Sequence, residues 1–209
     1  TISRRGLLAF AGAGSLLVGG LSVGQSLGGP FRRTALLAPH GQEVASGPGD
    51  FQVNQSAASA GVTAKLTDAS WRLTLGSGEG EQASGTPMML RRADLLRLQQ
   101  HTVSLPIACV EGWSTDSQVW TGVRLRDLAT LAGVASPASV FVQSIQHHGG
   151  FAQAVLSAGQ ILDQDSLLAL RVNGADLSLD HGYPARVIVP ASPGVHCTKW
   201  VAAMTFRRA

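Results

Sequence analysis

Short apolar runs with two different periods follow one another between Asp50 and Ala209. Over Trp71–Leu75 apolar and polar residues alternate, which predicts a strand, because successive side chains of a strand point to opposite faces. The run Arg91–Leu98 instead spaces its leucines as one face of a helix does. Between these runs lies the polar, glycine-rich stretch Gly76–Thr86, which predicts a loop.

A second helix is predicted over Leu125–Ala132. Leu125, Leu128 and Leu131 recur at a spacing that places them on one helix face. Gly133 follows directly, and glycine commonly ends a helix because it adopts the left-handed backbone conformation without a steric penalty.

The remaining apolar runs predict strands. Leu167–Val172 and Leu177–Leu179 flank the pair Asn173-Gly174, which favours a tight hairpin turn. Further strands are expected at Val103–Val110 (a buried strand leading to Cys109), Val140–Ile145, Arg186–Pro190 and Lys199–Phe206. Strands and helices do not alternate regularly, so the predicted fold class is α+β, with mixed sheets and short helices.

The first 29 residues follow another pattern. The stretch Gly6–Gly29 has 24 residues without a charge and lies between Arg4-Arg5 and Arg32-Arg33. About 20 apolar residues are enough to cross a bilayer as a helix. We therefore expect one N-terminal apolar helix within residues 1–29, a linker over residues 30–49 and one folded domain over residues 50–209.

Two interpretations of the N-terminal segment stay open. Gly20, Gly24 and Gly28 recur every four residues, which would let a second transmembrane helix approach closely, although glycines are also frequent in a weakly apolar leader. Ser3–Leu8 is similar to a twin-arginine export signal, a route that carries folded proteins. Under both interpretations we expect the globular domain to be membrane-tethered or exported, outside the cytoplasm.

The charge pattern argues against a nucleic-acid partner. The formal net charge is +3, only 14% of the residues are charged, and no basic stripe is interleaved with aromatic residues. A small anionic ligand fits this modest positive charge better. The two cysteines, Cys109 and Cys197, are too few for a disulfide framework, and a single disulfide between them stays open.

Cys109 is the first candidate for chemistry. It follows an apolar run and precedes Glu111-Gly112, a position that would hold a sulfur rigidly at a loop. A thiolate is a soft, electron-donating ligand that suits a redox metal. The alternative is that Cys109 is a small buried hydrophobic residue, as lone cysteines commonly are.

A second group of candidates lies near the C-terminus. Arg186 and Lys199 supply the charge that binds phosphate oxygens, His181 lies nearby in the sequence, and Gly182 and Gly194 would let backbone N–H groups approach an anion. The alternative is a set of solvated charges and ordinary turn glycines. Lys199 favours the ligand interpretation, because lysine is rare in this chain and this one precedes Trp200 in an apolar run.

The other histidines do not predict a zinc site. His147 and His148 are adjacent, as are His196 and Cys197, and neighbouring side chains seldom face the same ion. A structural zinc site needs four spaced ligands, and the sequence has no such spacing.

Several motifs in their order resemble the molybdopterin-binding domain of the sulfite oxidase family. They are CVEGWS followed by WTG, then LLALRVNG, HGYPAR and PGVHCTKWV. The resemblance covers about Asp50 to Ala209 and implies a sulfite-oxidase-like molybdopterin-binding fold. It also implies a molybdenum-molybdopterin cofactor, with Cys109 as the metal ligand and catalytic residue. The cofactor-binding residues that it implies are Asn54, His181, Arg186, His196, Cys197, Thr198 and Lys199, of which the run His196–Thr198 would act through backbone N–H groups.

Two positions depart from the family pattern. Val53 stands where sulfite oxidases carry an arginine, and Phe151 aligns with their active-site tyrosine. An anion such as sulfite would lose both donors, and a buried charge without partners is costly. The chain looks closer to the bacterial, exported branch of the family.

We therefore expect an enzyme that transfers an oxygen atom in a two-electron reaction on a small or sulfur-containing substrate. The expected partners are that substrate, an external electron carrier such as a membrane cytochrome, and the membrane through the N-terminal helix. The alternative is an exported domain that binds a pterin or another anion without catalysis, as a sensor or scaffold.

Overall fold

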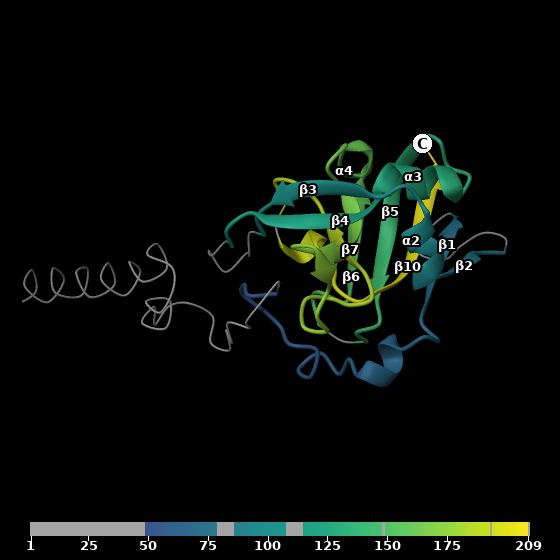
Figure 1. Ribbon diagram of the computed structural model, residues 1–209. Coiled ribbons are helices and arrows are strands. Elements are labelled where there is room, and N and C mark those ends of the chain that lie inside the picture. The colour runs from purple at the N-terminus through teal and green to yellow at the C-terminus, as the bar shows by residue number, and fades with distance from the viewer. Residues whose placement is uncertain (1–48, 79–85, 108–114, 148, 193, 209) are drawn as a thin grey trace, which may run out of the picture. The chain divides into compact units, whose positions relative to one another are not determined.

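The computed structural model describes residues 49–78, 86–107, 115–147, 149–192 and 194–208 (Figure 1). The expected N-terminal apolar helix and Cys109 lie outside these residues. Within the described ranges, no helix combines the length and the apolar composition needed to cross a bilayer.

The first sheet has five strands in the order β2-β1-β10-β5-β6. Its strands are β1 (Arg72–Ser77), β2 (Met88–Arg91), β5 (Pro137–Ser144), β6 (Gln153–Ser157) and β10 (Val201–Arg208). Only the pair of β1 and β10 is parallel, whereas the other three pairs are antiparallel. The sheet is therefore mixed, and its central strand comes from the C-terminal part of the chain.

The second sheet has the order β3-β4-β7-β8, and β9 also pairs with β7. Its strands are β3 (His101–Leu105), β4 (Gln118–Arg124), β7 (Leu167–Val172), β8 (Ala175–Asp176) and β9 (Arg186–Ile188). All of its pairs are antiparallel. In Figure 1, β3 and β4 run across the direction of β5 and β10.

The helices are short. They are the α-helices α2 (Arg92–Arg97), α3 (Leu125–Leu131) and α4 (Ala158–Leu162) and the 3-10 turns η2 (Ala64–Thr67) and η3 (Gly194–His196). Helix α3 ends before Gly133, which has a φ of 77°, as the sequence predicts. Its Leu125 and Leu128 are fully buried, whereas Leu131, in the last turn, is exposed.

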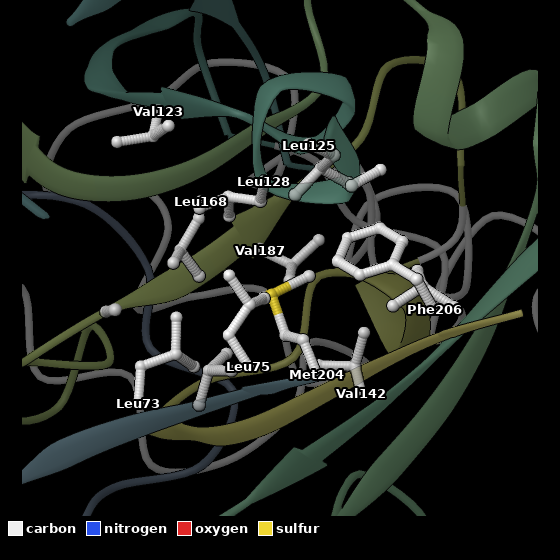
Figure 2. Close-up of a cluster of buried hydrophobic side chains, with 14 of the residues drawn as sticks. Leu73, Leu75, Val123, Leu125, Leu128, Val142, Leu168, Val187, Met204 and Phe206 are labelled. Carbon is white, nitrogen blue, oxygen red and sulfur yellow. The ribbon is translucent and has the colours of Figure 1, made fainter. Parts of the chain in front are cut away.

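The largest hydrophobic cluster lies between the two sheets. In Figure 2, Leu73 and Leu75 of β1 and Met204 of β10 face Leu168 of β7 and Leu128 of α3. All five are at most 1% exposed. At roughly 25 cal/mol per Å² of apolar surface removed from water, this packing is the main favourable contribution to the fold.

The region before Cys109 differs from the prediction of a buried strand over Val103–Val110. Strand β3 covers His101–Leu105 and alternates between half-buried and exposed residues. Antiparallel sheets commonly leave one face open to solvent, and β3 is in addition an edge strand whose one neighbour is β4.

Strand β7 is buried on both faces and joins two clusters. Leu168 and Leu170 belong to the cluster between the sheets, and Leu167 and Ala169 belong to a second cluster with Phe51 and Trp120. Successive side chains of a strand point to opposite faces, so β7 forms part of both cores. Arg186, which begins β9, lies opposite Ala169 in the register, so the core holds this arginine in place.

Candidate cofactor site

A pocket lies where the segment Gly49–Ala57, the loop before β9, the turn η3 and the residues before β10 meet. Ile107, and Gln146 and Phe151 from between β5 and β6, also line it. The pocket contains about 530 Å³ of space free of protein atoms, part of it open to solvent. Of the residues singled out from the sequence, those that line it are Asn54, Phe151, His181, Arg186, Gly194, Cys197, Thr198 and Lys199.

His181 is buried and held on two sides. Its ring stacks on Phe51, with ring centroids 3.8 Å apart, and its Nε2 lies 2.8 Å from the carbonyl oxygen of Gly49. A carbonyl only accepts, so Nε2 carries the proton. Burial lowers the pKa of His181 to about 4, against the raising effect of the Gly49 hydrogen bond and with the lowering effect of Arg186 and Lys199. The ring is therefore neutral at pH 7, and Nδ1 is a hydrogen-bond acceptor.

Arg186 is a buried cation. Its two terminal nitrogens donate to the carbonyl oxygens of His181 at 3.1 Å and Cys197 at 3.2 Å. Its guanidinium carbon lies 5.2 Å from the ring centroid of Trp120, a cation–π contact. Burial lowers the pKa of Arg186 to about 10, so it keeps its charge at neutral pH.

Lys199 is a second buried cation in the same pocket. Its Nζ donates to the carbonyl oxygens of Gln55 and, at 2.9 Å, Asp180, and it lies 4.5 Å from the ring centroid of Trp200. Burial, together with the charge of Arg186, lowers the pKa of Lys199 to about 7. The carboxylates of the described residues form no salt bridge with Lys199 or Arg186.

Gly182 allows the two cations to approach each other. A Cβ at this position would lie 3.0 Å from Cβ of Arg186 and 3.1 Å from Cβ of Lys199, closer than most real Cβ contacts, so both side chains would have to shift. Its φ of 107° is also one that residues with a side chain rarely adopt. Glycine is therefore favoured at position 182 for two reasons: it has no side chain, and it adopts this backbone conformation without strain.

Of the predicted residues in the segment before β10, Cys197 and Thr198 line the pocket and His196 does not. Thr198 is buried and lines the pocket. Cys197 lines it too, as a free thiol whose pKa is raised by burial, and its backbone N–H donates to the carbonyl oxygen of Gly194 within η3. His196 is not among the lining residues, and its Nδ1 lies 3.1 Å from Nε2 of Gln160 in α4.

Asn54 and Cys109 complete the predicted set. Asn54 lines the pocket from an exposed position in the segment Gly49–Ala57. Cys109 lies outside the described residues, so its role as metal ligand stays a prediction from the sequence. Ile107, two residues earlier, lines the pocket.

Sequence reasoning missed several uncharged residues of the pocket. They are Gln52, Gln55, Ile107, Gln146, Val195 and Trp200. Phe51, which stacks on His181, was missed as well. The only signal for Gln52 and Gln55 was their place beside Asn54, because glutamines have no motif of their own.

The donor set fits a ligand with an oxyanion group. Two buried cations lack a carboxylate partner among the described residues, and buried charges are normally paired. The Nε of Arg186 and Oγ1 of Thr198 are buried and have no hydrogen-bond partner in the same part of the chain. Both atoms can donate, as a phosphate oxygen requires.

Comparison with known proteins agrees with this chemistry. Residues 60–209 match the family described as the oxidoreductase molybdopterin binding domain. The uncharacterized oxidoreductase YuiH of Bacillus subtilis is 32% identical over 122 residues, which cover 58% of this chain and 60% of that protein. Sulfite oxidase of Arabidopsis thaliana is 30% identical over 107 residues, 43% of this chain and 27% of that protein.

A solved structure supports the fold. The crystal structure of the sulfane dehydrogenase SoxCD from Paracoccus pantotrophus superposes with a TM-score of 0.63. The match covers 82% of this chain and 45% of that chain at 21% identity. The matches thus span 60% or less of the length of these proteins.

Proposed function

The chain belongs to the oxidoreductase molybdopterin-binding domain family, and from this premise we propose that it is an enzyme that transfers an oxygen atom to or from a small substrate with a molybdenum-molybdopterin cofactor. One observation carries the proposal: two buried cations, Arg186 and Lys199, face a pocket without a carboxylate partner among the described residues. A structural ion pair would have such a partner, so these charges favour an anionic ligand.

In this proposal, Arg186, Lys199 and the Thr198 hydroxyl hold the phosphate of the pterin. The neutral His181 borders the same pocket, and Phe51 and Gly49 fix the orientation of its ring. When bound, the cofactor supplies two-electron redox chemistry at molybdenum, with Cys109 as the protein ligand. The protein contributes position and electrostatics.

The substrate is proposed to be small and to carry little negative charge of its own. Phe151 lines the pocket where the resemblance aligns a tyrosine, so this side chain offers no hydroxyl donor. Val53 likewise offers no charge where sulfite oxidases have arginine. A sulfur-containing substrate without a full negative charge avoids the cost of leaving an anion unpaired.

We further propose that the domain works outside the cytoplasm and passes its electrons to a separate carrier. The support is the sequence alone: paired arginines before an uncharged segment of 24 residues, Gly6–Gly29. An acceptor such as a membrane cytochrome would suit a tethered domain.

Metal and pterin analysis tests the proposed function. The full chain is produced with molybdate in a host that makes molybdopterin, and both groups are measured in the purified protein. We expect stoichiometric molybdenum and pterin in the wild type, and loss of turnover in Cys109→Ser. Protein that is folded but contains neither group would show the proposal to be wrong.

The same preparation separates an enzyme from a scaffold. A domain that binds the pterin without catalysis would contain the cofactor, but would turn over none of a panel of sulfur and nitrogen oxides with an artificial electron donor or acceptor.

A further inference from the structure

Three buried polar atoms of the pocket residues lack a partner. They are Oε1 of Gln55, Nε of Arg186 and Oγ1 of Thr198, and none has a hydrogen-bond partner within the part of the chain that the structure describes. Buried polar atoms are nearly always paired, so these three point to a ligand that would complete their hydrogen bonds.

The three atoms need different hydrogen-bonding groups on the ligand. Arg186 Nε can only donate a hydrogen bond, and the Thr198 hydroxyl can donate one. Gln55 Oε1 can only accept. A fully deprotonated oxyanion would therefore satisfy Arg186 and Thr198 but would leave Gln55 unpaired. The complete ligand must also present an N–H or O–H donor.

The backbone around Gln55 is fixed, so its side chain has a defined place. The Gln55 carbonyl oxygen accepts a hydrogen bond from Nζ of Lys199. Two residues later, the Ala57 N–H donates to the carboxylate of Asp180 at 2.8 Å. On the other side, Phe51 is anchored by stacking on His181. The backbone is thus held on both sides of Gln55, which lines the pocket.

We propose that Gln55 is a cofactor-binding residue whose side-chain oxygen accepts a hydrogen bond from an N–H group of the pterin ring. This inference rests on the proposed function and deepens it. It divides the pocket into a cationic part, with Arg186 and Lys199, that binds the phosphate, and an amide part, around Gln55, that recognises the heterocycle.

Retention of the pterin tests this assignment without any assay of turnover. Wild type, Gln55→Met and Gln55→Glu are loaded in the same host and dialysed for the same time. The remaining pterin is then released by denaturation and measured by its fluorescence after oxidation. We expect Gln55→Met, which keeps the length of the side chain but cannot accept, to lose pterin roughly tenfold faster, as removal of one hydrogen bond does. Gln55→Glu keeps the acceptor but adds a negative charge beside the cationic part, so its response to sulfate should fall, unlike that of Gln55→Met.

Sulfate provides the matched probe for the cationic part, because it is an oxyanion without a donor at neutral pH. Its stabilisation of the cofactor-free protein, measured as the rise in Tm, should be the same in Gln55→Met as in the wild type. Ser56→Ala is the control for a disturbed segment, since the Ser56 hydroxyl bonds only to Ser59 in the described structure, and it should retain pterin normally.

Several results would overturn the assignment. They are equal pterin retention in Gln55→Met and wild type, equal loss in Ser56→Ala and Gln55→Met, or a sulfate response in Gln55→Met that falls together with pterin retention. If the wild type itself retains no pterin, the proposed function is wrong and the role of Gln55 falls with it. If only the variants fail to differ, the role of Gln55 alone is wrong.

Discussion

Arg186, Lys199 and His181 are all buried in one pocket, but burial leaves each with a different charge state. Arg186 stays charged, Lys199 has its pKa near neutrality, and His181 is neutral. Backbone carbonyls supply their hydrogen bonds but no full negative charge. In the cofactor-free protein the pocket thus holds uncompensated positive charge, which an arriving oxyanion neutralises.

This arrangement predicts how the stability of the cofactor-free protein depends on pH. The pKa of Lys199 is about 7 in the folded state and 10.5 ordinarily, so between these values the unfolded chain binds a proton that the folded protein lacks. The free energy of unfolding should therefore rise as the pH rises from about 7 to about 9.5. His181, at about 4 against 6.5, adds a rise in the same direction between those values. Urea denaturation at a series of pH values measures both.

Lys199→Met is the control for the upper window. In this variant the contribution of Lys199 to the slope above pH 7 should vanish. A wild-type stability that falls between about pH 7 and pH 9 would contradict the burial of an uncompensated lysine.

At the residue level, the sequence predicted the charged residues of the pocket and some of its neutral residues, but not its glutamines. Lys199 stood out because a lysine is unusual in an apolar run, and Gly182 because glycines accompany anion sites. Gln55 could not be predicted as a pocket residue, because its position is fixed by Lys199. This lysine lies 144 residues away in the chain and donates to the Gln55 carbonyl oxygen. No local pattern records such a contact.

At the level of elements, the hairpin of β7 and β8 shows how one turn residue connects three strands. Asn173 and Gly174 both have positive φ, 49° and 82°, as the predicted Asn-Gly turn requires. Asn173 also exchanges two hydrogen bonds with Val119 in β4, at 2.7 and 2.9 Å, and its Nδ2 donates to Oε1 of Gln118. The turn therefore ties β7 to β4 at the end of their shared ladder.

Two substitutions at Asn173 separate its roles. Asn173→Gly keeps the backbone conformation but loses the side-chain hydrogen bonds, so we expect a loss of about 1 kcal/mol in the free energy of unfolding. Asn173→Ala adds the strain of a left-handed backbone, for a total of about 2–3 kcal/mol. Urea denaturation measures both. Equal stability of the two variants would show that the backbone conformation contributes nothing.

Elements whose apolar residues form a clear pattern were predicted, and strands without such a pattern were missed. The strands around Leu73, Phe141 and Leu168 and the helix at Leu125 lie where the pattern predicts them. Strands β2, β4 and β6 were missed, because two of them are edge strands with few buried residues and β4 carries polar residues among its apolar ones. Pairing partners, rather than local propensity, make these segments strands.

At the level of the domain, three hydrophobic clusters share their elements. The cluster between the sheets contains Trp71, the one beneath the pocket contains Trp120, and a third contains Trp200. The first two clusters meet in β7 and β9, whose successive residues face alternate cores. The pocket therefore depends on the same strands that hold the sheets together.

The domain should therefore unfold in one cooperative step. We expect the thermal transitions measured by far-UV circular dichroism and by tryptophan fluorescence to coincide. Sulfate should shift both curves by the same amount, since a ligand of the native state stabilises the whole cooperative unit. Two separate transitions, or a shift in fluorescence alone, would show that the pocket region unfolds independently.

The parallel pair of β1 and β10 has a consequence for biosynthesis. Strand β10, residues 201–208, lies at the centre of the first sheet. Strands β1 and β5 therefore cannot pair with it until those residues have left the ribosome. Lys199 and Thr198 emerge only just before that strand. The nascent chain therefore has no finished cavity to fill until then, and insertion of a prosthetic group must follow the synthesis of this last strand.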